Sequence, residues 1–191
     1  MGFLIWYGFL VWEVNPLVRQ ELDRHLGVIA NAATNKTLKA AVGSTLAAYG
    51  FERWIYATEN PCGAMGMPVV LSDGFGLWLL KYMANGYQAV DPLVAYSRTA
   101  DEPLLWDTMC TWPNIPGKGQ FLLRDLAAQN IGSGMAIPLR DKDGPQGLLN
   151  IVVSESLVDK RTYFEAVQPD LVEIGHSIHR TMVKIMKATG F

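Results

Sequence analysis

The sequence predicts an α/β fold, an α/β/α sandwich in which helices flank a mainly antiparallel sheet of about five strands. Three observations carry this prediction. Half of the 191 residues are hydrophobic, which is enough to bury a core without disulfides. Segments with helical spacing occupy both ends of the chain, and short segments rich in aromatic and β-branched residues are gathered in its middle. No repeat, low-complexity tract or linker divides residues 1–191, so we expect a single domain.

The N-terminal part divides into an apolar arm and two helices. Residues 1–14 lack a basic start and a small-residue cleavage site, and their apolar run is too short to span a bilayer. We therefore expect an arm that packs on the domain or on a second copy, and no membrane association. Asn15 as a cap and Pro16 at the first helical position begin an amphipathic helix. A second helix covers 35–50, and Gly50 ends it.

The middle of the chain begins with two neighbouring strands. Residues 51–59 are aromatic and β-branched, and a Pro/Gly-rich connection leads to the apolar run 67–72. The elements expected next are, in order, helices at 74–85 and 91–100, an extended piece at 102–107, a Pro-containing loop at 108–118 and a helix at 119–130.

The last third reads as a hairpin and a long helix. Two strands at 133–140 and 147–156 are joined by a turn that contains Asp143 and Gly144, which indicates an antiparallel pair. From Asp159, a plausible cap, the pattern is helical to residue 187, with Pro169 as a break or kink.

Composition excludes several classes of function. The net charge is −2 and Lys and Arg are scattered, so this sequence has no electrostatic footprint for nucleic acid. Cys62 and Cys110 have no CxxC spacing, and the three histidines do not complete a metal-ligand set with them. We therefore expect a reduced, cytoplasmic protein without a metal site or cofactor. His176 and His179 are expected at the surface.

The segment from residue 74 to residue 106 gathers polar groups among apolar ones. Trp78 and Tyr82 are four residues apart, which places both on one face of a helix. Pro92 keeps Asp91 out of the helical conformation, so the carboxylate heads a turn or a new helix. An indole NH, a phenol and a carboxylate among apolar neighbours are typical of a pocket for a mostly apolar small molecule. The alternative is structural: the aromatic residues would be core and Asp91 a helix cap.

These residues carry a resemblance to a known family. The pattern W-x3-Y-x8-D-P-x13-W, followed by SGMAIPLR and GLLNIVVSE, resembles the autoinducer-binding domain of LuxR-type quorum-sensing transcriptional regulators over roughly residues 40–185. The resemblance implies a receptor that encloses an N-acyl-homoserine lactone in an apolar pocket and couples occupancy to folding and to dimerisation as a homodimer. It also implies that DNA is bound only through a helix-turn-helix domain, which residues 1–191 are not expected to contain.

The resemblance implies roles for individual residues. Trp78 would donate its indole NH to the lactone carbonyl, and Asp91 would accept from the ligand amide NH. Tyr82 and Trp106 would wall the headgroup, and Asn150 lies where the family often places a hydroxyl near the amide carbonyl. The full set of expected ligand-binding residues is Trp78, Tyr82, Asp91, Trp106, Asn150, Tyr56, Pro92, Gly134, Ala136 and Phe75.

One position departs from the family pattern. The family usually has a Tyr four residues before the pocket Trp, and here that residue is Gly74. Either Asn150 or a strand residue such as Tyr56 supplies the missing donor, or the headgroup pose or ligand class differs.

Three other functions are alternatives. A sensor could bind a different apolar molecule. A homologue without the DNA-binding domain could block a complete regulator through the arm 2–12 and the last helix. An enzyme acting on the lactone would need Asp91 or Ser133, and neither has a histidine or metal cluster beside it, so we expect no catalysis.

Overall fold

The computed structural model describes residues 16–59, 68–107, 115, 117–140, 144–153 and 159–190. Its sheet has the strand order β2-β1-β5-β4-β3, and every neighbouring pair is antiparallel. The strands are β1 (Arg53–Thr58), β2 (Val69–Asp73), β3 (Leu104–Asp107), β4 (Ser133–Arg140) and β5 (Gln146–Val152). The predicted antiparallel sheet is therefore confirmed, including the β4–β5 hairpin.

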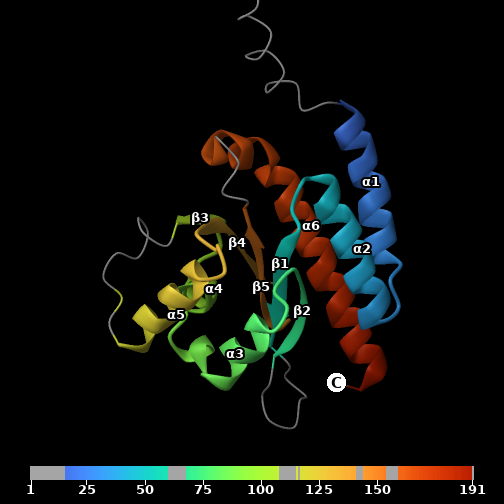
Figure 1. Cartoon of the computed structure of the whole chain (residues 1–191). Helices are drawn as coiled ribbons and strands as arrows, with labels where there is room; N and C mark the ends of the chain where they lie inside the picture. Colours follow the sequence, from blue (N-terminus) through green and yellow to red (C-terminus); the bar gives the residue numbers. More distant parts are fainter. Residues whose placement is uncertain are drawn as a thin grey trace, which may run out of the picture.

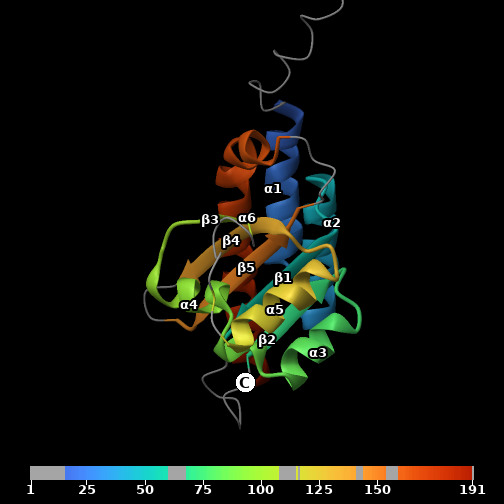
Figure 2. The ribbon, with the colours of Figure 1, turned by 60° about the vertical axis from the view of Figure 1, so that its left-hand side comes forward.

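Helices cover both faces of this sheet (Figure 1). On one face lie α1 (Pro16–Ala30), α2 (Asn35–Ala48) and the long α6 (Lys160–Thr189). On the other lie α3 (Trp78–Ala84), the short turn η1 (Tyr87–Ala89), α4 (Pro92–Thr99) and α5 (Lys118–Ala127). Figure 2 shows α4 and α5 in front of the strands, with α1 and α6 behind them. The arrangement is the α/β/α sandwich that the sequence predicts.

Two helices, α4 at the cavity and α6 at the C-terminus, each begin with a capping aspartate. Asp91 has an extended backbone, its side chain accepts from Leu93 N, and Pro92 follows at the first helical position of α4. Asp159 caps α6, and its side chain accepts from Thr162 N. α6 runs unbroken through Pro169 and changes direction in its first half (Figure 1).

The alternation of side chains along the central strands separates two cores. On β1, Trp54 and Tyr56 pack against the α1–α2–α6 layer, whereas Ile55 faces the α3–α4–α5 layer. On β5 the same alternation sends Leu149 and Ile151 to the first layer. The opposite face of β5, toward α3, α4 and α5, carries Leu148, Asn150 and Val152.

His179 corrects an expectation, because it lies in the first core and not at the surface. Its Nδ1 is 2.8 Å from the Tyr56 hydroxyl, and its Nε2 is 2.9 Å from the Pro145 carbonyl oxygen. A carbonyl can only accept, so Nε2 carries a proton and donates to it; in the neutral ring Nδ1 then accepts from the Tyr56 hydroxyl. The ring joins α6 to the start of β5.

Several expectations concern residues outside the described part of the chain: the arm 1–14, Cys62, Cys110 and Asp143. In the part that is described, no helix combines the length and apolar character needed to cross a membrane. The same residues contain no group of three or more His, Cys, Asp or Glu side chains placed to hold a metal ion.

Candidate functional site

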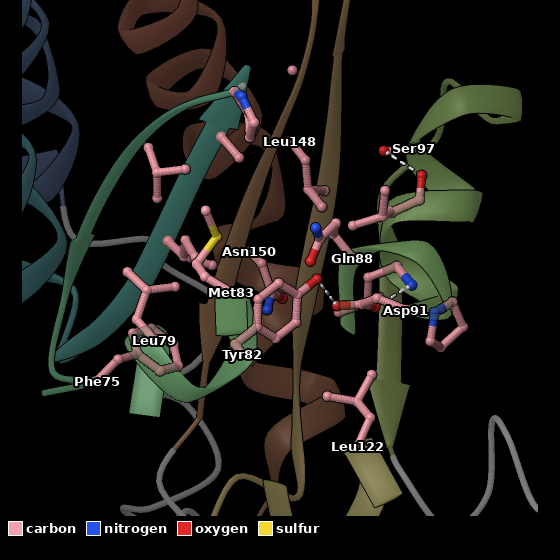
Figure 3. Close-up of a pocket in the computed structure, with 18 of the residues that line it drawn as sticks. Phe75, Leu79, Tyr82, Met83, Gln88, Asp91, Ser97, Leu122, Leu148 and Asn150 are labelled. Carbon is pink, nitrogen blue, oxygen red and sulfur yellow. Dashed lines mark hydrogen bonds between the residues drawn. The ribbon is translucent and has the colours of Figure 1, made fainter. Parts of the chain in front are cut away.

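A cavity of about 460 Å³ lies between the sheet and the α3–α4–α5 layer. This volume falls within the range of roughly 300–1,000 Å³ that is usual for small-molecule sites. Figure 3 shows side chains from α3, α4, α5 and β5 around it. Exposed lining residues, Glu59, Pro68, Gln88 and Arg98, mark the rim that faces solvent. The apolar wall includes Ile55, Leu79, Leu122, Leu126, Ile131 and Leu148.

The α3 side of the cavity is a row of aromatic rings. The ring centroids of Phe75 and Trp78 are 5.6 Å apart, those of Trp78 and Tyr82 are 5.3 Å apart, and those of Tyr82 and Tyr87 are 6.0 Å apart. The indole NH of Trp78 is buried and has no hydrogen-bond partner among the described residues. An unsatisfied buried donor costs about 1–3 kcal/mol. Since Trp78 lines the cavity, an acceptor on a bound molecule would relieve that cost.

Asp91 and Tyr82 form a partly buried polar pair, and the Tyr82 ring lies beside that of Trp78. The Tyr82 hydroxyl donates to Asp91 Oδ2 at 2.8 Å, and Leu93 N donates to Oδ1 at 2.8 Å; Figure 3 shows the two side chains turned toward each other. Burial raises the pKa of Asp91 above its usual range, although the hydrogen bonds from Tyr82 and Leu93 oppose the shift. Desolvation outweighs the hydrogen bonds that the carboxylate accepts, including one from the Val94 backbone, so an additional NH group on a ligand would stabilise its charged form.

The opposite wall holds a Trp106–Asn150 pair. Trp106 Nε1 donates to Asn150 Oδ1 at 2.8 Å. An indole can only donate, so this bond assigns the amide oxygen of Asn150 and leaves its NH2 group as the donor for the cavity, which Asn150 lines. Gly134, paired with Trp106 across β3 and β4, is what lets the indole lie against the β4 backbone. A Cβ there would meet the Ile151 carbonyl oxygen and lie 2.7 Å from Trp106 Cζ2.

Gly134→Ala is therefore expected to destabilise the unliganded protein by about 1–3 kcal/mol through overpacking. The added methyl group displaces Trp106 and with it the orientation of Asn150. Urea denaturation of both proteins measures the change in the free energy of unfolding. Gly27→Ala is the matched control, because a Cβ at Gly27 has no atom within 4 Å. Equal stability of the Gly134 variant and its parent would contradict the expectation.

The structure brings most of the predicted site residues together. Seven of them line the cavity: Phe75, Trp78, Tyr82, Asp91, Pro92, Trp106 and Asn150. Gly134 and Ala136 are buried on β4 beside it without lining it, and Ala136 packs in the same apolar cluster as Trp106.

Tyr56 corrects the expectation that it could supply a donor to the site. It is fully buried on the opposite face of β1, where its hydroxyl is bonded to His179. Alternation sends Ile55 to the cavity in its place. Gln88, Arg98 and the α5 residues of the wall were not in the predicted set. The α5 residues could have been predicted from the apolar face of the helix expected at 119–130.

At Gly74, where the family resemblance implies a Tyr, neighbouring atoms already fill the space of a side chain. Its φ is +76°, and a Cβ there would lie 2.6 Å from Arg53 Cγ and 2.8 Å from the Glu52 carbonyl oxygen. The Arg53 guanidinium in turn donates to the Gln129 carbonyl at 2.7 Å. This backbone leaves no room for a side chain at position 74, so no donor to the cavity can come from that position.

Comparison with known proteins gives both a family and a fold. A model of the family described as "Autoinducer binding domain" matches residues 34–182. The transcriptional activator protein AnoR of Acinetobacter nosocomialis is 21% identical over 151 residues, which are 78% of this chain and 62% of that protein. The chain spans between 32% and 62% of the length of the curated relatives that it matches.

Two solved structures have the same architecture. The N-acylhomoserine lactone dependent LuxR family transcription factor CepR2 from Burkholderia cenocepacia superposes with a TM-score of 0.74 at 18% identity, over 91% of this chain and 99% of that one. SdiA in complex with octanoyl-rac-glycerol superposes with a TM-score of 0.56 at 14% identity, over 85% of this chain and 68% of that one. At these identities the structures establish a shared fold.

Proposed function

We propose a function that starts from one premise: this chain belongs to the autoinducer-binding domain family of LuxR-type quorum-sensing regulators. Its cavity binds an N-acyl-homoserine lactone, and occupancy stabilises the fold and favours a homodimer. In a complete regulator, a helix-turn-helix domain outside residues 1–191 would pass this state to DNA. The dependence of CepR2 on an N-acylhomoserine lactone supports the ligand class.

The observation that carries the proposal is a set of three polar groups on the walls of an otherwise apolar cavity. The indole NH of Trp78, which has no partner among the described residues, can donate to a ligand acceptor; the desolvated Asp91 carboxylate can accept from a further donor, and the Asn150 NH2 group can donate. An N-acyl-homoserine lactone presents a lactone carbonyl, an amide NH and an acyl carbonyl, which match these groups one to one. Its acyl chain would lie against the apolar wall formed by β5 and α5.

This proposal predicts a large thermal shift. A ligand at a hundredfold excess over its dissociation constant stabilises the folded state by about 2.7 kcal/mol. For a domain of this size, about 1 kcal/mol corresponds to roughly 2–4 °C, so the cognate lactone is expected to raise the melting temperature by about 5–11 °C. Scanning calorimetry with a panel of acyl lengths measures the shift, and mass spectrometry should recover the lactone intact. The absence of any shift across the panel would refute the lactone assignment.

A second ligand class has one observation in its favour. SdiA, which shares the fold, was solved with octanoyl-rac-glycerol. An acylglycerol has acceptor carbonyls and hydroxyl donors but no amide NH, so only a hydroxyl could serve Asp91. Including 1-octanoyl-rac-glycerol in the same thermal panel separates the two classes. A larger shift with the acylglycerol than with every lactone would assign the cavity to that class.

A further inference from the structure

Helix α3 forms one wall of the cavity and is only partly buried, with Trp78 and Leu79 packed against the second core. None of its residues is buried, and on its outer face Leu80 is 66% exposed, as is the preceding Leu77 at 82%. On its inner face Trp78, Leu79 and Tyr82 line the cavity. Unlike α2 and α6, which have buried residues, α3 therefore covers the cavity with its inner face and leaves its outer face to solvent.

The segment that contains α3 and η1, residues 77–90, also has glycines in the left-handed conformation near its start and within it. Gly74 and Gly76 precede α3 with φ of +76° and +51°, and Gly86 separates α3 from η1 with φ of +63°. Glycine adopts these values without the steric cost that other residues meet, and small residues often absorb the dihedral changes of a hinge.

One carboxylate on the neighbouring helix joins both parts of this segment. Asp125 of α5 accepts from Lys81 Nζ of α3 at 2.7 Å through Oδ1, and from the Tyr87 hydroxyl of η1 at 2.6 Å through Oδ2. The side chain of Asp125 is only 19% exposed. The bonds from Lys81 and then Tyr87 lower the pKa of Asp125, so the carboxylate is charged at neutral pH. Both oxygens are used, one for each part of the segment.

We propose that Asp125 is a positioning residue that clasps residues 77–90 over the cavity, and that opening of this clasp is the route by which ligand enters and leaves. The inference rests on the proposed function in taking the cavity as the ligand site. Asp125 does not line the cavity and so acts through α3 and η1. The row of rings from Trp78 to Tyr87 moves with the segment, which would expose the cavity when the clasp opens.

Hydrogen exchange of the unliganded, full chain tests the clasp without any ligand. Asp125→Asn keeps the shape of the side chain and weakens its bond to Lys81, and Tyr87→Phe removes a single hydrogen bond to Asp125. Both are expected to speed exchange in peptides covering 77–90 by about tenfold, because each weakens a charge-assisted hydrogen bond that holds the segment closed. Exchange in β4, β5 and α6 should stay unchanged.

The control is Glu165→Gln, which removes an exposed carboxylate paired with Arg161 on α6. It should leave exchange in 77–90 as it is in the parent. Unchanged exchange of this segment in both clasp variants would overturn the proposal. If Asp125→Asn speeds exchange throughout the chain, Tyr87→Phe decides: acceleration confined to 77–90 supports the clasp, and no acceleration there overturns it.

Binding kinetics then separate gating from contact. With N-decanoyl-homoserine lactone as the probe, Asp125→Asn should raise the association and dissociation rate constants by a similar factor, leaving Kd within about threefold of the parent. A faster dissociation alone, with Kd weakened equally, would show that Asp125 supports bound ligand and would overturn the gating role. If the parent binds no lactone, the proposed function fails, and the exchange experiment still decides the clasp.

Discussion

Asp91→Asn is expected to weaken binding of an N-acyl-homoserine lactone by about 10- to 100-fold. A hydrogen bond to a charged group contributes about 1.5–3 kcal/mol, and each 1.4 kcal/mol is a factor of ten in Kd. The fold should survive, because the Asn oxygen can still accept from Leu93 N and cap α4. The NH2 group would then face the Tyr82 hydroxyl and the ligand NH, where an acceptor is needed. Isothermal titration of both proteins measures the loss.

The same variant should change how stability depends on pH. Because the pKa of Asp91 is raised in the folded protein, that state binds more protons than the unfolded chain between the usual and the raised pKa. Stability is thus lost as pH rises through the raised pKa, and this loss should disappear in Asp91→Asn. Melting temperatures of the unliganded proteins across acidic pH measure it.

Asp101→Asn is the control for both measurements. It removes an exposed carboxylate that pairs with Arg140, outside the cavity. Its ligand affinity should match that of the parent. If Asp91→Asn also binds as the parent does while folding normally, the assigned position of the ligand amide is wrong.

Much of the site could be predicted because its signals are local. Asp91 before Pro92 specifies a cap in any context, and the structure has that cap. Asn150 shares a strand face with Leu148 and Val152, so period-2 alternation predicts that it points inward, as it does. Both inferences depend on residues close together in the sequence.

Tyr56 could not be placed in this way because β1 is an interior strand and both of its faces are covered. Trp54 and Tyr56 on one face and Ile55 and Ala57 on the other are all apolar or aromatic, and the two polar residues, Arg53 and Thr58, fall one on each face, so neither face is marked as the outer one. Which face meets the cavity depends on where α2 and α6 pack. By contrast, helical spacing held a signal for His179, which is four residues after Gly175 and three before Met182 on the buried side of α6.

The contacts that hold the cavity wall in place could not be predicted from residues close together in the sequence. Asp125 meets Lys81 and Tyr87 across 44 and 38 residues of sequence, and it does so only because α5 packs beside η1. Gly74 is the same kind of case: the Arg53 side chain that closes its space comes from the strand paired with β2. Both the Asp125 contacts and the crowding at Gly74 depend on how elements distant in the sequence pack together. The family pattern, in which the expected Tyr is missing here, therefore could not indicate what takes its place.

Trp78→Phe is expected to separate the stability of the unliganded protein from its affinity for ligand. The phenyl ring keeps its place between Phe75 and Tyr82, while the variant loses the buried NH that has no partner among the described residues. Removing an unsatisfied donor relieves a cost of about 1–3 kcal/mol, which offsets the packing lost with the smaller ring. The unliganded melting temperature should therefore stay the same or rise.

Ligand affinity of Trp78→Phe should fall by about tenfold, because the hydrogen bond to the lactone carbonyl is lost. The thermal shift produced by the lactone shrinks accordingly. Trp54→Phe is the matched control: Trp54 lies in the opposite core, so its truncation should lower the unliganded melting temperature and leave Kd unchanged. A purely structural Trp78 would behave like Trp54. A fall in unliganded stability at position 78 with unchanged Kd would therefore remove this indole from the binding site.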